Sequence, residues 1–147
     1  KMHIYGPIDD NKYWNDCENL IKKNGGSEKF IYKGSIKRKD IFHTLSNYDL
    51  FFLPTHGENF GHVIFDAINC GLPVLLSNNT PWKNIEKYSI GWSVPLENEE
   101  KFIQIINSFQ NWELSYKQNF NENSKKFLIE NFNLNDVIIS YKKLFNI

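Results

Sequence analysis

The sequence lacks an excess of charge of either sign. Lysine and arginine together number 17, as do aspartate and glutamate, so the formal net charge of the 147 residues is zero at pH 7. Domains that bind nucleic acid usually carry a clear basic excess, because lysine and arginine neutralise the phosphates. The composition therefore predicts no nucleic-acid partner.

Cysteine is nearly absent as well, since Cys17 and Cys70 are the two in the chain. They do not have the spacing of a zinc site, and no two of the four histidines are spaced as metal ligands. This spacing predicts no metal site. We also expect two reduced, buried thiols, because disulfides are rare in the cytosol.

Long apolar runs and a secretion signal are also missing. No run approaches the ~18 residues of a membrane span, and the opening segment Lys1–Tyr5 resembles the inside of a folded domain, not a signal peptide. We therefore expect a cytoplasmic protein. The apolar share of 41% suffices for the packed core of a single domain that covers residues 1–147.

Short apolar runs alternate with helical patterns, which is typical of βαβ units. The run Leu50–Leu53 is continuously apolar, as expected for a strand covered on both faces. The sequence predicts an α/β class, with a Rossmann-like parallel sheet of about five strands and helices on both faces. The strands are expected near Met2–Tyr5, Phe30–Lys33, Asp49–Leu53, Pro73–Leu76 and Gly91–Val94.

Apolar residues with helical spacing lie between and after these strands. The first helix is expected to begin near Asp10, and Gly71 is expected to close the third. The predicted stripes are Tyr13, Cys17, Leu20 and Ile21; Ile41, Phe42 and Leu45; Phe60, Ile64, Ala67 and Ile68; and Phe102, Ile105, Ile106 and Phe109. Two further helices are predicted at about Trp112–Asn131 and Leu134–Phe145.

The segment Leu53–Asp66 carries the most chemical information. A buried strand is predicted to end at its start, a short polar loop follows, and a helix begins around Phe60. In doubly wound sheets, ligands bind outside the carboxyl ends of the strands, where such loops lie. Gly61 lets a ligand approach the backbone closely, and free N–H groups at a helix start favour an anion such as a diphosphate.

Two carboxylates accompany this anion site: Glu58 lies on the loop and Asp66 more than a turn into the helix. Each can accept hydrogen bonds from sugar or ribose hydroxyls. The residues alone leave two interpretations open. One is a phosphate-ligand site; the other is an ordinary strand–loop–helix turn, with Glu58 placed by the helix dipole and Asp66 on a solvated face.

The same segment resembles the acidic motif of retaining GT-B glycosyltransferases of family 4. That motif has two carboxylates separated by seven residues, with Phe-Gly just after the first, as in Glu58–Asp66. Glu58–Ile64 and Thr80-Pro81-Trp82 look like one bacterial subgroup, which is associated with polysaccharide and O-antigen assembly. Similarity also extends over Lys33–Ile36, Tyr48–Phe51, Ala67–Val74 and Gly91–Val94.

The resemblance implies the nucleotide-sugar-binding, C-terminal half of a GT-B fold and a role for each matching residue. Glu58, as the catalytic residue, accepts hydrogen bonds from the hydroxyls of the donor sugar, and Asp66 holds the ribose. The backbone amides of Asn59, Phe60 and Gly61 meet the sugar and the diphosphate, while Gly34 and Ile36 contact the base.

Three neighbouring side chains keep alternatives open. His62 falls in the first helical turn, where the dipole favours its neutral form, so it donates to phosphate or packs against the loop. His56 lines the sugar pocket or is structural. Trp82 covers the bound donor or anchors the packing.

The sequence departs from the family in two ways. Asp66 stands where the family usually has glutamate, so either a direct contact or a bridging water can serve the ribose. The family's C-terminal domain also begins with another strand, a helix and a basic pair that grips the diphosphate, and an N-terminal acceptor domain precedes it. We expect the chain to be a fragment that lacks these parts.

The expected function is retaining transfer of a sugar from a nucleoside diphosphate sugar, the donor substrate, to a glycan or lipid-linked acceptor. The resemblance implies no cofactor and no metal. The acceptor and any contact with the inner face of the membrane would belong to the missing part. Two alternatives are a non-catalytic nucleotide-sugar-binding module and a sugar-nucleotide epimerase of GT-B architecture, which is not expected to carry the acidic motif.

Overall fold

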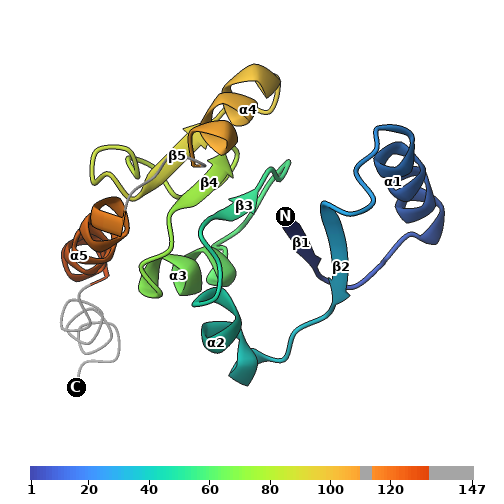
Figure 1. The fold of residues 1–147 in the computed structure, drawn as a ribbon. Helices are drawn as coiled ribbons and strands as arrows, with labels where there is room; N and C mark the ends of the chain where they lie inside the picture. The colour runs from blue at the N-terminus through green and yellow to red at the C-terminus, as the bar shows by residue number, and fades with distance from the viewer. Residues whose placement is uncertain (110–113, 133–147) are drawn as a thin grey trace. The chain divides into compact units, whose positions relative to one another are not determined.

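The computed structural model of the chain describes residues 1–109 and 114–132. The chain divides into two compact units, Lys1–Ile41 and Phe42–Ile147, each with parallel strands and helices (Figure 1). All five predicted strands are present, which confirms the α/β class. Hydrogen bonds join them into a two-stranded and a three-stranded sheet instead of one sheet, because periodicity locates strands without saying which edges pair. That residues 1–147 form one domain stays a prediction.

In the first unit, the strands β1 (Met2–Tyr5) and β2 (Phe30–Gly34) pair in parallel, and the helix α1 (Asn11–Lys23) connects them. The start of α1 is as predicted. The Asp10 carboxylate caps it by accepting hydrogen bonds from the backbone amides two and three residues later, at 2.8 and 3.0 Å.

The predicted apolar stripe of α1 is wrong in part. Tyr13 and Leu20 are 70% and 65% exposed, and Cys17 is half-buried. Ile21 of the stripe is half-buried. Trp14, which lies outside the stripe, makes an aromatic contact with the sheet: its ring centroid lies 4.8 Å from that of Tyr32 on β2. An aromatic residue outside the stripe thus shares in the contact with the sheet, which the apolar period does not reveal.

The remaining elements lie mainly in the second unit, after a 3₁₀ turn at Arg38–Asp40. They are α2 (Ile41–Leu45), β3 (Phe51–Leu53), α3 (His62–Asn69), β4 (Val74–Ser77), β5 (Gly91–Val94), α4 (Glu99–Ser108) and α5 (Leu114–Asn131).

The sheet of the second unit has the order β3-β4-β5, and all its strands are parallel. β4 is central, with Val74 paired to Phe51 on one side and to Gly91 on the other. All four residues of β4 are buried. The carboxyl ends of the three strands therefore meet at one edge of the sheet, where ligands bind in folds of this kind.

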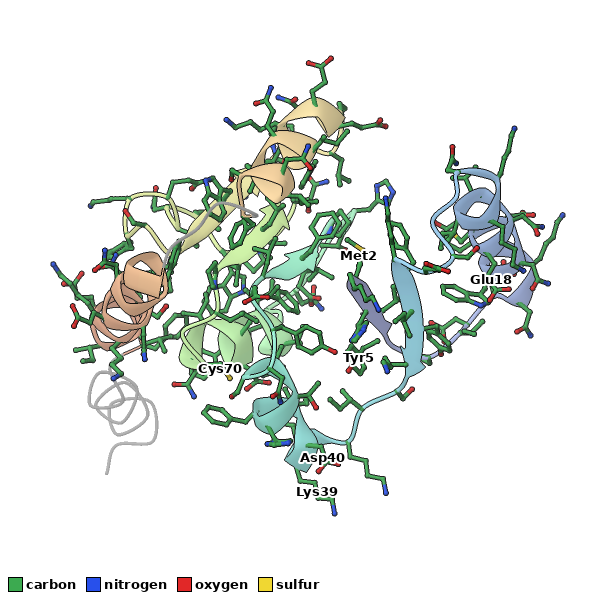
Figure 2. All side chains as sticks on the ribbon, viewed as in Figure 1. Met2, Tyr5, Glu18, Lys39, Asp40 and Cys70 are labelled. Atoms are coloured by element: carbon green, nitrogen blue, oxygen red, sulfur yellow. The ribbon has the colours of Figure 1, made fainter. Side chains whose placement is uncertain are left out.

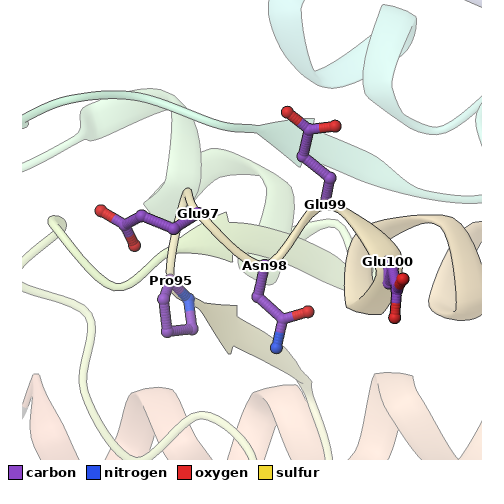
Figure 3. Close-up of a pocket in the computed structure, with 5 residues that line it drawn as sticks. All are labelled: Pro95, Glu97, Asn98, Glu99 and Glu100. Carbon is purple, nitrogen blue, oxygen red and sulfur yellow. The ribbon is translucent and has the colours of Figure 1, made fainter.

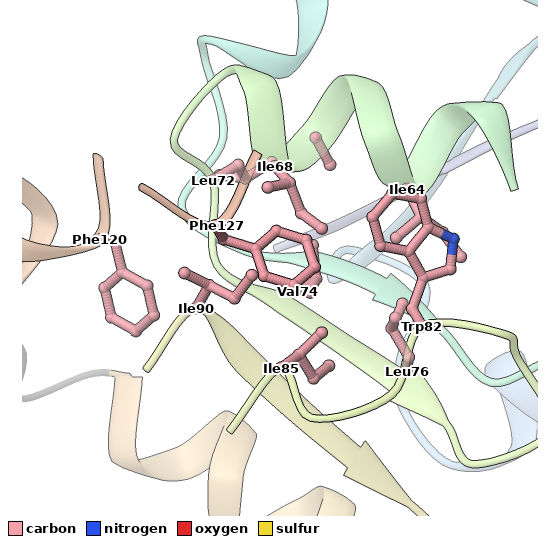
Figure 4. Close-up of a cluster of buried hydrophobic side chains, with 11 residues drawn as sticks. Ile64, Ile68, Leu72, Val74, Leu76, Trp82, Ile85, Ile90, Phe120 and Phe127 are labelled. Atoms are coloured by element: carbon pink, nitrogen blue, oxygen red, sulfur yellow. The ribbon is translucent and has the colours of Figure 1, made fainter. Parts of the chain in front are cut away.

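The core of the second unit lies on both faces of this sheet, because successive residues of a strand point to opposite faces. Val74 and Leu76 belong to one cluster, and Leu75 between them belongs to the other. The first cluster, shown in Figure 4, includes buried residues of α3 and α5. The second includes Phe102 and Ile105 of α4. Helices on both faces are thereby confirmed for this unit.

The helix α3 begins two residues later than predicted. Gly61 is its N-cap and has a left-handed backbone (φ 75°, ψ 61°), so Phe60 lies outside the helix. The predicted stripe keeps Ile64, Ala67 and Ile68, which are all fully buried. Gly71 ends the helix as predicted, with φ of 69°.

The fourth predicted helix is present as α4, and α5 corresponds to the fifth. The predicted helix at Leu134–Phe145 lies outside the described residues, as does Trp112 at the predicted start of the fifth. Among the helices that the structure describes, none combines the length and the apolar character that crossing a membrane requires.

Candidate functional site

The predicted strand–loop–helix arrangement is present between β3 and α3. β3 ends at Leu53, the segment 54–61 follows, and α3 begins at His62. Because β3 is parallel to β4 and β5, this loop lies at the carboxyl edge of the three-stranded sheet. It carries His56, Glu58, Asn59 and Phe60, which are all exposed. A ligand outside the sheet edge can therefore reach these residues.

Hydrogen bonds within the loop fix its shape. The Thr55 hydroxyl donates to the carbonyl oxygen of Gly57 at 2.7 Å, and the Gly57 amide lies 3.2 Å from the same hydroxyl oxygen. The Asn59 amide donates to Oε1 of Glu58 at 3.0 Å. The Glu58 carboxylate is thus held against its own loop, while its exposure leaves room for a ligand.

Gly61 joins the loop to α3 and has little space around its α-carbon. A β-carbon at this position would lie 2.7 Å from Cδ1 of Ile64 and 3.0 Å from Cγ of Glu58. The Glu58 side chain therefore folds over the backbone at the start of the helix. The Glu58 side chain thus lies beside the start of α3, where the first amides of the helix have no partner one helical turn before them.

Two residues outside the loop hold its ends. The Ser77 hydroxyl, at the end of β4, donates to the carbonyl oxygen of Thr55 at 2.5 Å. The indole Nε1 of Trp82 donates to the carbonyl oxygen of Phe60 at 2.5 Å. Trp82 is only 4% exposed, which favours its interpretation as a packing anchor over a cover for the donor.

Ser77 was missed because the predicted strand ended at Leu76, so the serine fell outside it. A small polar residue directly after a buried apolar run at the carboxyl edge of a sheet is the signal that points to it. For Trp82, nothing in the spacing of the sequence indicates a partner 22 residues away.

Phe60 has its ring in an aromatic group at the start of α3. Its centroid lies 4.9 Å from that of His62, 5.6 Å from Trp82 and 6.5 Å from Phe65. His62 is exposed and in the first turn of α3, as predicted, and its contact with Phe60 agrees with packing against the loop. Donation by His62 to a phosphate stays a prediction.

Asp66 is half-buried and lies one turn into α3, four residues before Cys70. Cys70, labelled in Figure 2, donates from its thiol to the carbonyl oxygen of Phe42 on α2 at 3.9 Å. Burial raises the pKa of the Cys70 thiol; a hydrogen bond with Ser46 opposes this rise, and the Asp66 charge adds to it. The thiol therefore stays protonated at neutral pH. The expectation of buried thiols is wrong, because Cys17 and Cys70 are both partly exposed, but both are free as predicted.

The structure thus brings together six of the predicted residues on one loop and helix start, namely His56, Glu58, Asn59, Phe60, Gly61 and His62, and it places Asp66 on the same helix. Gly34 and Ile36 belong to the first unit, where Gly34 ends β2 with φ of 73° and Ile36 is half-buried. Their contact with the base of a nucleotide stays a prediction, as do the roles of the other residues.

Two hollows lie elsewhere on the second unit. One, of about 510 Å³, follows β5 and is lined by Pro95, Asn98 and three glutamates (Figure 3). The other, of about 230 Å³, lies where β3 and β4 begin and includes Asp49, Cys70 and Asn121. Neither is lined by a predicted donor-binding residue. No group of three or more histidine, cysteine or carboxylate side chains suited to a metal ion occurs within residues 1–109 and 114–132.

We expect Gly61→Ala to lower the free energy of unfolding by about 1–3 kcal/mol, because alanine disfavours the left-handed backbone and its methyl group meets Ile64. Chemical denaturation measures this change. Gly57→Ala is the matched control in the same loop, since no atom lies within 4 Å of the added carbon. Equal stability of the two variants would show that Gly61 does not need its left-handed conformation.

Solved structures of similar fold include glycosyltransferases. The chain aligns with HepE of Anabaena in complex with UDP over 98% of its own length and 40% of HepE, with a TM-score of 0.77 and 17% identity. For WaaG, a glycosyltransferase involved in lipopolysaccharide biosynthesis, 90% of the chain and 34% of WaaG align, with a TM-score of 0.71 and 20% identity. The chain thus spans well under half of either protein.

A third similar structure is the C-terminal domain of the group 1 family protein LpcC from Francisella tularensis. Its TM-score is 0.64 at 15% identity, with 84% of this chain and 64% of that domain covered. These likenesses confirm the predicted Rossmann-like fold of a GT-B C-terminal domain. The sequence finds no match among curated proteins.

Sequence similarity at the level of the family covers both units. Residues 1–127 match the family described as Glycosyl transferases group 1, and this range includes every predicted site residue from Gly34 to Asp66. The matched range is most of the 147 residues. The chain therefore belongs to the Glycosyl transferases group 1 family.

Proposed function

We propose that the chain binds a nucleoside diphosphate sugar and is the donor-binding part of a family 4 glycosyltransferase that retains the anomeric configuration. Family membership supports the reaction class. The similar fold of HepE, whose structures contain UDP or UDP-glucose, supports a uridine nucleotide as the first donor to test. The longer protein would transfer the sugar to a glycan or lipid-linked acceptor held by an N-terminal domain.

One observation carries this proposal: the Glu58 side chain packs beside Gly61 at the start of α3, with its Cγ 3.0 Å from the place of a Gly61 β-carbon. The start of a helix favours anions, because its first amides are free and the helix dipole adds about half an elementary positive charge. Glu58 would repel a bare anion but can accept hydrogen bonds from hydroxyl groups. A ligand with a diphosphate at one end and a hydroxylated ring at the other matches both features.

The remaining residues take the roles that the family resemblance implies. The amides of Asn59, Phe60 and Gly61 contact the sugar and the diphosphate, and His62 lies beside them on the first turn of α3. His56 borders the sugar, and Asp66 serves the ribose, directly or through a water. The resemblance also assigns the contact with the base to Gly34 and Ile36.

In this reaction the chain mainly positions the donor and stabilises the departing diphosphate. As the bond to the sugar breaks, negative charge grows on the diphosphate, next to the amides at Gly61 and His62. Positive charge grows on the sugar ring beside Glu58, whose hydrogen bonds fix the ring. The proposal needs no cofactor and no metal. A cytoplasmic enzyme, with the full-length protein at the inner face of the membrane, fits a lipid-linked acceptor.

A second candidate is a nucleotide-sugar-binding module without transferase activity. The half-buried Asp66 favours it, because aspartate is one methylene shorter than the glutamate usual in the family and lies near Cys70. The intact loop at Glu58–Gly61 favours the enzyme. A product assay on the full-length protein separates the two, since a binding module would hold the donor and release no glycoside.

A thermal-shift panel of nucleotide sugars tests donor binding. At a concentration 100 times the Kd, a ligand stabilises the folded chain by about 2.7 kcal/mol, which raises the Tm by roughly 5–10 °C in a chain of this size. We expect UDP-glucose to give such a shift and a free sugar to give none. A panel of uridine, guanosine, adenosine and thymidine diphosphate sugars that leaves the Tm unchanged would contradict the proposed function.

A further inference from the structure

Trp82 is held firmly inside the second unit, after β4. It is 4% exposed and belongs to the buried cluster of Figure 4. Its ring is stacked on that of Phe132, with a centroid distance of 5.3 Å and an interplanar angle of 30°, and lies 6.1 Å from the ring of Phe127. Because a buried indole N–H needs an acceptor, the place of that acceptor is fixed together with the ring.

The acceptor is the carbonyl oxygen of Phe60, at 2.5 Å. Every described peptide bond is trans, and the C=O and N–H of a trans peptide point in opposite directions in one plane. The bond to Trp82 therefore fixes the Gly61 N–H as well, which is directed away from the indole. Among the described residues the Gly61 amide has no acceptor, whereas its carbonyl accepts from the amides of Ile64 and Phe65.

The segment that carries Trp82 is itself anchored to the end of β4. The Thr80 side chain is buried and its hydroxyl lies 3.3 Å from the carbonyl oxygen of Ser77. The Lys83 ammonium donates to the carbonyl oxygen of Asn78 at 2.6 Å, and Ile85 is fully buried. Trp82 therefore holds the loop in a fixed position relative to the central strand β4, because both its ring and its backbone are anchored in the second unit.

We infer that Trp82 is a positioning residue of the donor site: its indole N–H holds the Phe60–Gly61 peptide so that the Gly61 amide faces the diphosphate. This inference rests on the proposed function. A glycine at Gly61 tolerates both orientations of the preceding peptide. Without the indole donor, the peptide divides between two orientations, and only one of them presents the N–H to a ligand.

The test compares Trp82→Phe with the unsubstituted chain. Phenylalanine keeps an aromatic ring in the cluster and removes the N–H. We expect the Gly61 amide resonance to shift in the ¹⁵N–¹H spectrum without ligand. The Kd for UDP should rise about 3- to 10-fold, in line with the loss of one hydrogen bond and a lower share of the competent orientation. The Kd for uridine, which has no phosphate, should change less than 2-fold.

Two control variants separate positioning from packing. Trp92→Phe makes the same substitution on β5, where the ring contacts Phe109 and Phe120. Phe65→Leu thins the aromatic group, since Phe65 lies 6.5 Å from Trp82, but keeps the indole N–H. Both should leave the ratio of the UDP and uridine Kd values unchanged.

An unchanged Gly61 resonance in Trp82→Phe would overturn the inference, and so would an equal weakening of UDP and uridine binding. If Trp82→Phe does not fold, hydrogen exchange of the indole N–H in the unsubstituted chain decides. We expect protection as strong as that of the α3 amides, and rapid exchange would overturn the inference. Failure of the unsubstituted chain to bind UDP or any nucleotide sugar, with the Gly61 shift present, would instead contradict the proposed function.

Discussion

Replacing Gly91 with alanine is expected to lower the free energy of unfolding by at least about 3 kcal/mol, the upper end of the usual cost of overpacking. Gly91 begins β5 and pairs with Val74 on the central strand. A β-carbon there would lie 2.1 Å from the carbonyl oxygen of Val74 and 2.6 Å from its Cγ2. The first of these atoms is backbone, so β5 must move away from β4 to make room.

Such a movement affects the whole unit, because β4 is central and β5 carries Val94 of the core beside α4. A loss of this size is a large part of the ~5–15 kcal/mol that separates folded from unfolded domains. Urea denaturation followed by circular dichroism measures it.

Ser93→Ala is the matched control on the same strand, because it removes an oxygen and adds no atom. We expect its stability to stay within about 1 kcal/mol of the unsubstituted chain. If Gly91→Ala proved as stable as Ser93→Ala, the close approach of β5 to β4 would be refuted, and with it the register that places Val74 opposite Gly91.

The strands were largely predictable from the sequence, because buried parallel strands are short apolar runs between polar segments. Met2–Tyr5 and Gly91–Val94 agree with the structure at both ends. β4 is displaced by one residue: Pro73 has no N–H for the ladder, and Ser77, which is polar, is nonetheless paired with Val94 and buried. The prediction therefore missed Ser77, the last residue of β4, and the hydrogen bond that its hydroxyl donates to Thr55 in the loop.

The location of the candidate site in the chain was predictable from local signals, but the long-range contacts that hold its loop in place were not. A polar loop after an apolar run predicted where Glu58 and Gly61 would lie, because the cause is local. The hydrogen bond from Trp82 to Phe60 joins residues far apart in the chain, and no period or motif encodes such a contact. For α3, the left-handed Gly61 moved the helix start past Phe60, since that conformation cannot continue a right-handed helix.

The roles proposed for Glu58 and Asp66 predict a second large effect, on the affinity for the donor. We expect Glu58→Gln to raise the Kd for the nucleotide sugar roughly 10- to 150-fold, which corresponds to about 1.5–3 kcal/mol for a lost charge-assisted hydrogen bond. The Kd for the nucleoside diphosphate alone should change little, because Glu58 is assigned to the sugar. Glutamine keeps the oxygen that accepts the hydrogen bond from the Asn59 amide, so the loop retains its internal contact.

Asp66→Asn should instead weaken both ligands by similar factors, because the ribose is common to them. Calorimetric titration of each variant with UDP-glucose and UDP measures the four Kd values that decide. Glu97→Gln is the control, since Glu97 lines the hollow after β5 and lies outside the loop between β3 and α3. It removes the same charge and should change neither Kd by more than 2-fold.

The reverse pattern, with Glu58→Gln weakening both ligands and Asp66→Asn only the nucleotide sugar, would exchange the two roles. Equal, small effects of all three substitutions would show that the carboxylates act through overall charge, and that the loop at Glu58–Gly61 does not contact the sugar.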